Sequence, residues 1–264
     1  MKRLLLLFSL PFLIAMSASG QANSLRLHIA SGFTGCELKN ESMSPLTYYG
    51  PGAHGYIGFV DGRPKGIHQL SFYGGASFTT PFVGNSIINL YSFDFDYSYL
   101  GKSGQLGGTG INLYAGGAFA MRFAMRNHLQ YSNNNFDMDQ AYSLAVAGMA
   151  ERAVKLKRRN LGFQWKLTMP LVSVSIVPGY IGRQPEGFIL NEEDEDWLTP
   201  LRSSEVVSFG SFFRMISDLG ISWNLINGNA IFAKYRWDFT QNSSGNYLAD
   251  AKHHFSFGFD INLK

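Results

Sequence analysis

The sequence predicts an all-β protein, a single antiparallel transmembrane β-barrel of about 10–12 strands. Composition is the first reason: 16% of the 264 residues are charged, whereas 15% are aromatic and 29 are glycine. Soluble domains contain about 25% charged residues. The second reason is that segment after segment alternates apolar with small or polar residues, the period of a strand between two environments. A soluble β-sandwich gives the same alternation with its apolar face inward, and a membrane barrel inverts it.

The first twenty residues have the pattern of a secretory signal peptide. Lys2 and Arg3 are followed by an apolar stretch from Leu4 to Met16, and Ala18-Ser19-Gly20 supplies the small residues of a cleavage site. We therefore expect residues 1–20 to be removed and residues 21–264 to form the barrel. Loss of Lys2 and Arg3 lowers the formal net charge of +3 by two, which argues against a nucleic-acid partner.

Two other kinds of chain are disfavoured by the mature sequence. It has no apolar run of about eighteen residues, so it predicts no transmembrane helix. Cys36 is its single cysteine, so no internal disulfide is possible.

The clearest alternation lies between residues 89 and 99. Tyr91, Phe93, Phe95, Tyr97 and Tyr99 share one face, and Ser92, Asp94, Asp96 and Ser98 share the other. The clearest hairpin joins the runs 215–225 and 231–240 through Asn227-Gly228-Asn229, because Asn-Gly readily adopts the positive φ angles of a tight turn.

Eleven runs alternate in this way: 24–33, 53–60, 67–79, 89–99, 111–123, 142–153, 161–169, 171–181, 215–225, 231–240 and 253–264. A barrel of this class has an even number of strands. Dropping the weakest run, 24–33, gives ten strands, and splitting the region 205–226 gives twelve. Pro170 predicts a turn or a bulge.

The last strand carries a recognisable motif. Phe255, Phe257, Phe259, Ile261 and Leu263 alternate with polar or small residues, among them Ser256 and Gly258. The pattern Ser256-x-Gly258-x-x-Ile261-x-Leu263 resembles the C-terminal sorting signal of Gram-negative outer-membrane β-barrel proteins. The resemblance implies location in the outer membrane, contact with its lipid and lipopolysaccharide, and recognition by the barrel-assembly machinery. The Asn-Gly-Asn hairpin and Tyr-Arg-Trp-Asp at 235–238 resemble Bacteroidota-type barrels.

If the apolar faces contact lipid, the opposite faces line the lumen. The charged residues expected there are five acidic and five basic: Asp94, Asp96, Asp218, Asp238 and Asp260, with Arg122, Lys166, Arg214, Lys234 and Arg236. A balanced set is typical of a salt-bridged polar plug, and a narrow, weakly selective pore is the alternative. The side chains expected to point outward include Phe93, Phe95, Trp223, Trp237, Phe257 and Phe259.

Residues 184–211 form the longest stretch without alternation, and they contain the acidic run 191–196. A solvated extracellular loop is the simplest interpretation. The alternative is a carboxylate cluster that binds Ca²⁺ or bridges divalent ions to lipopolysaccharide, although the spacing of a calcium-binding loop is absent.

Three functions are compatible with these observations. The first is a porin-like or transport-related barrel that passes small solutes. The second is a plugged structural or interaction barrel with a protein partner in the cell envelope. The third is a lipid-modifying enzyme, because His254-x-Ser256 resembles the His-x-Ser pair of outer-membrane lipid A deacylases. No strand follows to supply the acidic residue that this family uses, and no nucleotide or zinc motif occurs, so we expect neither metal nor cofactor.

Overall fold

The computed structural model describes residues 24–130, 135–156, 159–176 and 204–263. Its elements in this part of the chain are eleven strands: β1 Ser24–Asn40, β2 Ser44–Arg63, β3 Gly66–Pro81, β4 Ile88–Leu106, β5 Ile111–His128, β6 Phe136–Leu156, β7 Arg159–Ile176, β8 Glu205–Ser208, β9 Phe212–Asn224, β10 Ala230–Asn242 and β11 Leu248–Asn262. Among the described residues, no helix is long and apolar enough to cross a membrane.

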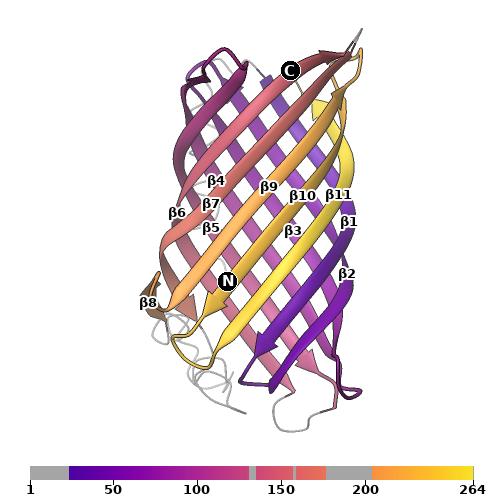
Figure 1. Ribbon diagram of the computed structural model, residues 1–264, viewed down its shortest axis with the longest axis vertical. Helices are drawn as coiled ribbons and strands as arrows, with labels where there is room; N and C mark the ends of the chain where they lie inside the picture. Colours follow the sequence, from indigo (N-terminus) through magenta and orange to yellow (C-terminus); the bar gives the residue numbers. More distant parts are fainter. Residues whose placement is uncertain (1–23, 131–134, 157–158, 177–203, 264) are drawn as a thin grey trace, which may run out of the picture.

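The strands form one closed antiparallel barrel in which chain neighbours are sheet neighbours. β1 pairs with both β2 and β11, so the first and last strands close the sheet. β8 and β9 pair with different segments of β7, which means that together they occupy one position in the ring. The barrel therefore has ten positions, and the predicted fold class is confirmed. Figure 1 shows the long strands running obliquely around a tall barrel.

The reduction from eleven runs to ten positions occurs at Pro170. The runs 161–169 and 171–181 were counted separately, but β7 continues through Pro170 to Ile176. The register against β6 shifts there, because Ala145 pairs with Pro170 and Leu144 pairs with Val172, leaving Leu171 as the extra residue. Proline cannot donate a ladder hydrogen bond, and a bulge accommodates it. The run 24–33, which we considered dropping, is a genuine part of β1.

The two faces of the wall differ as a membrane barrel requires. Aromatic side chains remain exposed on the outside, for example Trp223 at 54%, Phe257 at 64% and Phe259 at 62%. Phe93 is also exposed, and Phe95 and Trp237 are partly covered by neighbours on the same outer face. The inward positions are mostly polar and buried. A soluble sandwich would bury its aromatic faces instead, so this alternative is wrong.

The two ends of the barrel differ in their connections. The end that contains Ser24 and Asn262, called here the terminus end, lies at the top of Figure 1. Its turns are short, with two residues between Arg63 and Gly66 and five between Asn224 and Ala230. The last of these is the Asn-Gly hairpin, which is longer than the two-residue turn expected and has Gly228 at a φ of 83°. Short turns mark the periplasmic end of an outer-membrane barrel, so the opposite loop end faces the cell exterior.

Candidate functional site: the barrel interior

The ten charged residues predicted to line the lumen all project to the inner face. Nine of them are buried, with exposures between 0% for Arg122 and 8% for Asp218. The tenth, Lys234, keeps 17% of its side chain exposed. Some of them form ion pairs across the interior, others pair with a neighbouring strand, and Lys166 forms no ion pair among the described residues.

The middle of the barrel is bridged by two arginines. Arg214 on β9 lies 2.5 Å from Asp94 of β4 on another part of the wall, and it holds Asp238 of β10 at 2.6 Å and 2.9 Å. Arg236 on β10 donates to Asp96 of β4 at 2.7 Å. Planar guanidinium groups match carboxylates with two parallel hydrogen bonds, which fixes their orientation.

A second layer of ion pairs lies closer to the loop end. Arg122 on β5 reaches across the barrel to Asp250 of β11 and to Thr240 of β10, and it also contacts Asp139 of β6 at 3.2 Å. Arg126, four residues further along β5 on the same face, contacts Asp139 at 2.5 Å and Asp250 at 3.5 Å. Both arginine side chains are 0% exposed. Carboxylates and guanidinium groups buried together in this way compensate one another's charge in the interior.

Four of the five charged residues of this second layer were not predicted, because they lie beyond the ends of the alternating runs. Arg126 follows the run 111–123, and Asp137 and Asp139 precede the run that begins at 142. Asp250 precedes the run that begins at 253. Extending the alternation of each run in steps of two would have placed all four on the inner face.

The loop end also contains an apolar cluster inside the barrel, where sequence analysis expected polar residues. Leu38, Tyr48, Ile88, Leu90 and Leu248 pack together with exposures between 0% and 3%. The hydroxyl of Tyr48 is hydrogen bonded to His128 Nε2 at 3.1 Å across the barrel. We call these residues, with Cys36 and Ala124, the apolar cap. The cap lies at the loop end of the interior, beside the second layer of ion pairs.

The terminus end of the interior is hollow. A cavity of about 530 Å³, called here the vestibule, is lined by residues of β1, β2, β3, β5, β6, β7, β9, β10 and β11. Two ion pairs occupy its wall: Arg26 with Asp260 at 2.7 Å, and Lys234 with Asp218 at 3.1 Å. Lys234 also lies over the ring of Tyr56, with 4.8 Å between its ammonium and the ring centroid.

The His-x-Ser pair of the last strand is also internal. Ser256 accepts or donates a hydrogen bond at 2.7 Å with His54 of β2, not with His254. His54 and His254 both contact the hydroxyl of Thr34, at 3.0 Å and 2.9 Å. No carboxylate hydrogen bonds to either histidine in the described part of the chain. The cluster lacks the acidic group that orients a catalytic base, and it faces away from membrane lipid.

The four residues of the predicted sorting signal divide between the two faces. Ser256 is 1% exposed and Gly258 packs against Ile29, both on the inner face. Ile261 is half-buried and Leu263 is 47% exposed. Their recognition during assembly stays a prediction.

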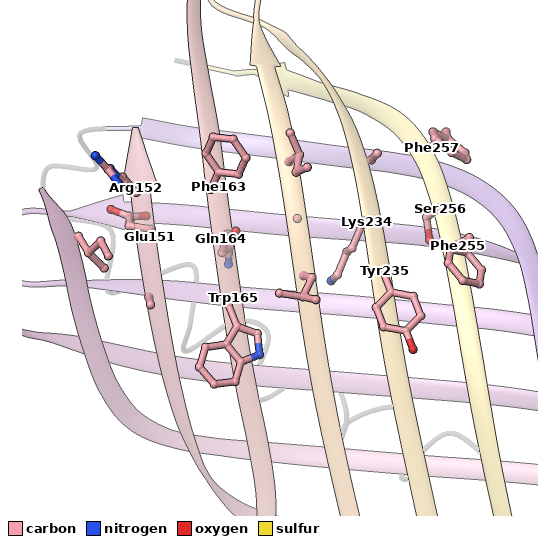
Figure 2. A pocket seen from close by; sticks show the side chains of 16 residues that line it. Glu151, Arg152, Phe163, Gln164, Trp165, Lys234, Tyr235, Phe255, Ser256 and Phe257 are labelled. Carbon is pink, nitrogen blue, oxygen red and sulfur yellow. The ribbon is translucent and has the colours of Figure 1, made fainter. Parts of the chain in front are cut away.

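The outer wall has a shallow apolar groove where the strands β7, β9, β10 and β11 meet the lipid. Figure 2 shows Phe163 and Trp165 on β7, Tyr235 on β10, and Phe255 and Phe257 on β11 around it. Small residues such as Ala233 form its floor. The groove is part of the apolar belt that contacts lipid.

No group of three potential metal ligands is found within the described ranges. The acidic run 191–196 lies outside the described residues, and the calcium hypothesis concerns it alone.

Comparisons with known proteins agree with this architecture. The outer membrane protease OmpT from Escherichia coli has a solved structure that matches with a TM-score of 0.53 at 9% identity, covering 92% of this chain and 98% of OmpT. The translocator domain of the autotransporter NalP from Neisseria meningitidis gives 0.40 at 9% identity, covering 94% and 91%. The β-domain of the Bordetella autotransporter BrkA gives 0.43 at 12% identity, covering 92% and 100%.

No protein-family model and no curated protein sequence matches the chain. At these identities the likeness to OmpT establishes the fold alone. Together with the apolar outer wall and the closed sheet, that fold places the protein in an outer membrane.

Proposed function

We propose that the protein is a plugged outer-membrane barrel that acts through the surfaces at its two ends, not by free passage of solutes through its lumen. The observation that carries this proposal is the pair of arginines Arg122 and Arg126, which are 0% exposed and reach Asp250 on another part of the wall. A pore of the same diameter would leave such groups hydrated. The proposal favours the interaction barrel over the porin-like one.

The loop end supplies the surface for a partner. Phe82 and Val83, in the connection between β3 and β4, are 89% and 78% exposed. Exposed apolar side chains at a loop tip are typical of contact sites. We propose that this tip belongs to a contact with another envelope protein or with lipopolysaccharide on the cell exterior.

Planar bilayers test the plug. Purified wild-type protein is expected to be electrically silent, whereas a variant with Arg122→Ser and Arg214→Ser is expected to conduct in discrete steps, because one cross-barrel arginine is removed from each of the two layers. Lys39→Ser, an exposed change outside the lumen, is the matched control and is expected to stay silent. Discrete wild-type conductance would refute the proposal.

Photo-crosslinking in cells tests the partner. A photoreactive residue at Val83 is expected to trap a specific adduct at the loop end, and one at Ile226, 90% exposed at the terminus end, is the control. Absence of an adduct at Val83 combined with conductance of the wild type would favour transport.

A transport role is the second candidate, and the vestibule favours it. A polar cavity that leads from the periplasmic end to the central ion pairs is the geometry of a half-open channel. Under this alternative, rearrangement of the ion pairs would be needed for each passage, and conductance would appear only with a suitable solute or voltage.

A further proposal concerns how the barrel is assembled in the membrane. We infer that Ser256, Gly258, Ile261 and Leu263 are read by the barrel-assembly machinery, and that the source is a Bacteroidota-type envelope, on the sequence resemblance. An in vitro assembly assay in which Leu263→Ser slows insertion, with unchanged stability once folded, would support the first of these.

A further inference from the structure

Among the charged residues that line the vestibule, Lys166, Glu151 and Arg152 form no ion pair in the described part of the chain, and of these Lys166 and Glu151 lie on the inner face. Arg26 pairs with Asp260, and Lys234 pairs with Asp218. Lys166 has no carboxylate within ion-pair distance in the described part of the chain, although Asp218 is its neighbour on β9. Glu151 likewise has no cation within that distance among the described residues. Both line the same cavity.

Three hydrogen-bond donors of the vestibule, the Lys166 ammonium and two glutamine amides, have only uncharged acceptors. The Lys166 ammonium donates to Ser98 Oγ at 2.7 Å and to Gln69 Oε1 at 3.1 Å. The side-chain amides of Gln69 and Gln164 both point at the sulfur of Met149, at 3.6 Å and 2.9 Å. A thioether is a weak acceptor. Lys166 is only 7% exposed, and its ammonium lines the same cavity as the two amide donors.

Glu151 supplies the opposite charge nearby. Its Oε1 accepts a hydrogen bond from the hydroxyl of Tyr114 at 2.6 Å. In the sheet Glu151 pairs with Gln164, so Lys166 is its diagonal neighbour on β7. Diagonal neighbours lie about 7–8 Å apart, and the two side chains bond to different partners, Glu151 to Tyr114 and Lys166 to Ser98 and Gln69.

We propose that the vestibule binds a small zwitterion from the periplasmic side, with its carboxylate on Lys166, Gln69 and Gln164 and its ammonium on Glu151. The volume of about 530 Å³ suits a ligand of the size of an amino acid or short peptide. A single anion such as phosphate would leave Glu151 unused, and a cation would leave Lys166 unused. The ligand class is therefore set by two opposite charges on adjacent strands.

Isothermal titration of the folded full-length barrel in detergent tests this proposal with four probes. They are alanyl-alanine, its N-acetylated form without the ammonium, its amide without the carboxylate, and inorganic phosphate. The wild type is expected to bind alanyl-alanine at least about tenfold more tightly than the other three, since each loses one charge-assisted contact. Equal binding of the zwitterion and its N-acetylated form, tighter binding of phosphate, or no binding of any probe would overturn the proposal.

Two variants locate the charges. Lys166→Gln is expected to weaken alanyl-alanine binding about tenfold or more. Glu151→Gln is expected to weaken it similarly, but to leave the weak affinity for the N-acetylated form unchanged. Lys39→Gln, at the loop end, is the matched control. Folding of each variant is checked by heat-modifiable gel mobility, and if Lys166→Gln does not fold, the wild-type probe selectivity decides.

This inference goes beyond the proposed function, and the two fail separately. A silent barrel that binds no zwitterion overturns only the vestibule site. A conducting barrel that binds alanyl-alanine through Lys166 and Glu151 overturns only the plug.

Discussion

Replacing Arg122 with methionine measures how much its buried ion pairs stabilise the barrel. The side chain of Arg122 is 0% exposed and contacts Asp250, Asp139 and Thr240. Breaking a buried ion pair by removing one partner costs about 3–5 kcal/mol. Arg126 still lies 2.5 Å from Asp139 and 3.5 Å from Asp250, so neither carboxylate is left without a cation. We therefore expect a loss at the lower end of that range, about 3 kcal/mol in the free energy of unfolding.

Urea unfolding of the barrel in lipid vesicles, followed by heat-modifiable gel mobility, is the assay for Arg122→Met. Lys39→Met is the control, because Lys39 forms an exposed pair with Glu41 at 3.2 Å, and such pairs contribute about 1 kcal/mol or less. Combining Arg122→Met with Asp250→Leu is expected to cost less than the sum of the two single changes, because the carboxylate is removed together with its partner. A loss below about 1 kcal/mol for Arg122→Met, equal to that of the control, would refute a dry, paired interior.

Three further outcomes are expected. Phe95→Arg should impair assembly, because an arginine facing lipid near the midplane costs roughly 2–4 kcal/mol, whereas Phe82→Arg at the exposed loop tip should fold normally; equal yields of folded protein would contradict the assigned lipid face. Gly258→Val should lower stability even when the barrel folds spontaneously in detergent, since a Cβ there would lie 2.1 Å from the carbonyl oxygen of Ile29; unchanged urea unfolding would count against the close approach. Cys36, buried at 5% exposure, should react with maleimide only in urea, and rapid labelling of the folded protein would argue for an open loop end.

The strand pattern could be predicted from the sequence because each strand touches two environments along its whole length. Alternation between residues 89 and 99 determines which face of β4 is polar, and that assignment needs no knowledge of the neighbouring strands. The bulge at Pro170 was harder to predict. One inserted residue shifts the alternation, so a single strand with a bulge has the same pattern as two strands with a turn between them.

The partners inside the barrel could not be predicted, because they depend on the closed ring. Arg122 and Asp250 are separated by 128 residues, and they meet because the pairing of β1 with β11 closes the sheet and places β11 across the interior from β5. Alternation also predicts that inward positions are polar, and this prediction is wrong for the apolar cap. Leu38 on β1 and Ile88 on β4 pack against apolar side chains from other strands of the cap. The sequence of one strand does not show which residues of the other strands it will contact.

The different contents of the two ends follow from which residues occupy the inward positions. Toward the loop end these positions carry long side chains, such as Arg126 and Tyr48, that meet others from across the barrel. Toward the terminus end several of them are glycine, including Gly220, whose added Cβ would meet nothing closer than 3.9 Å. A closed sheet of fixed strand number has a nearly constant width, so side-chain volume determines where space remains. Among the described residues, the interior is therefore filled toward the loop end and hollow toward the terminus end, where the vestibule lies.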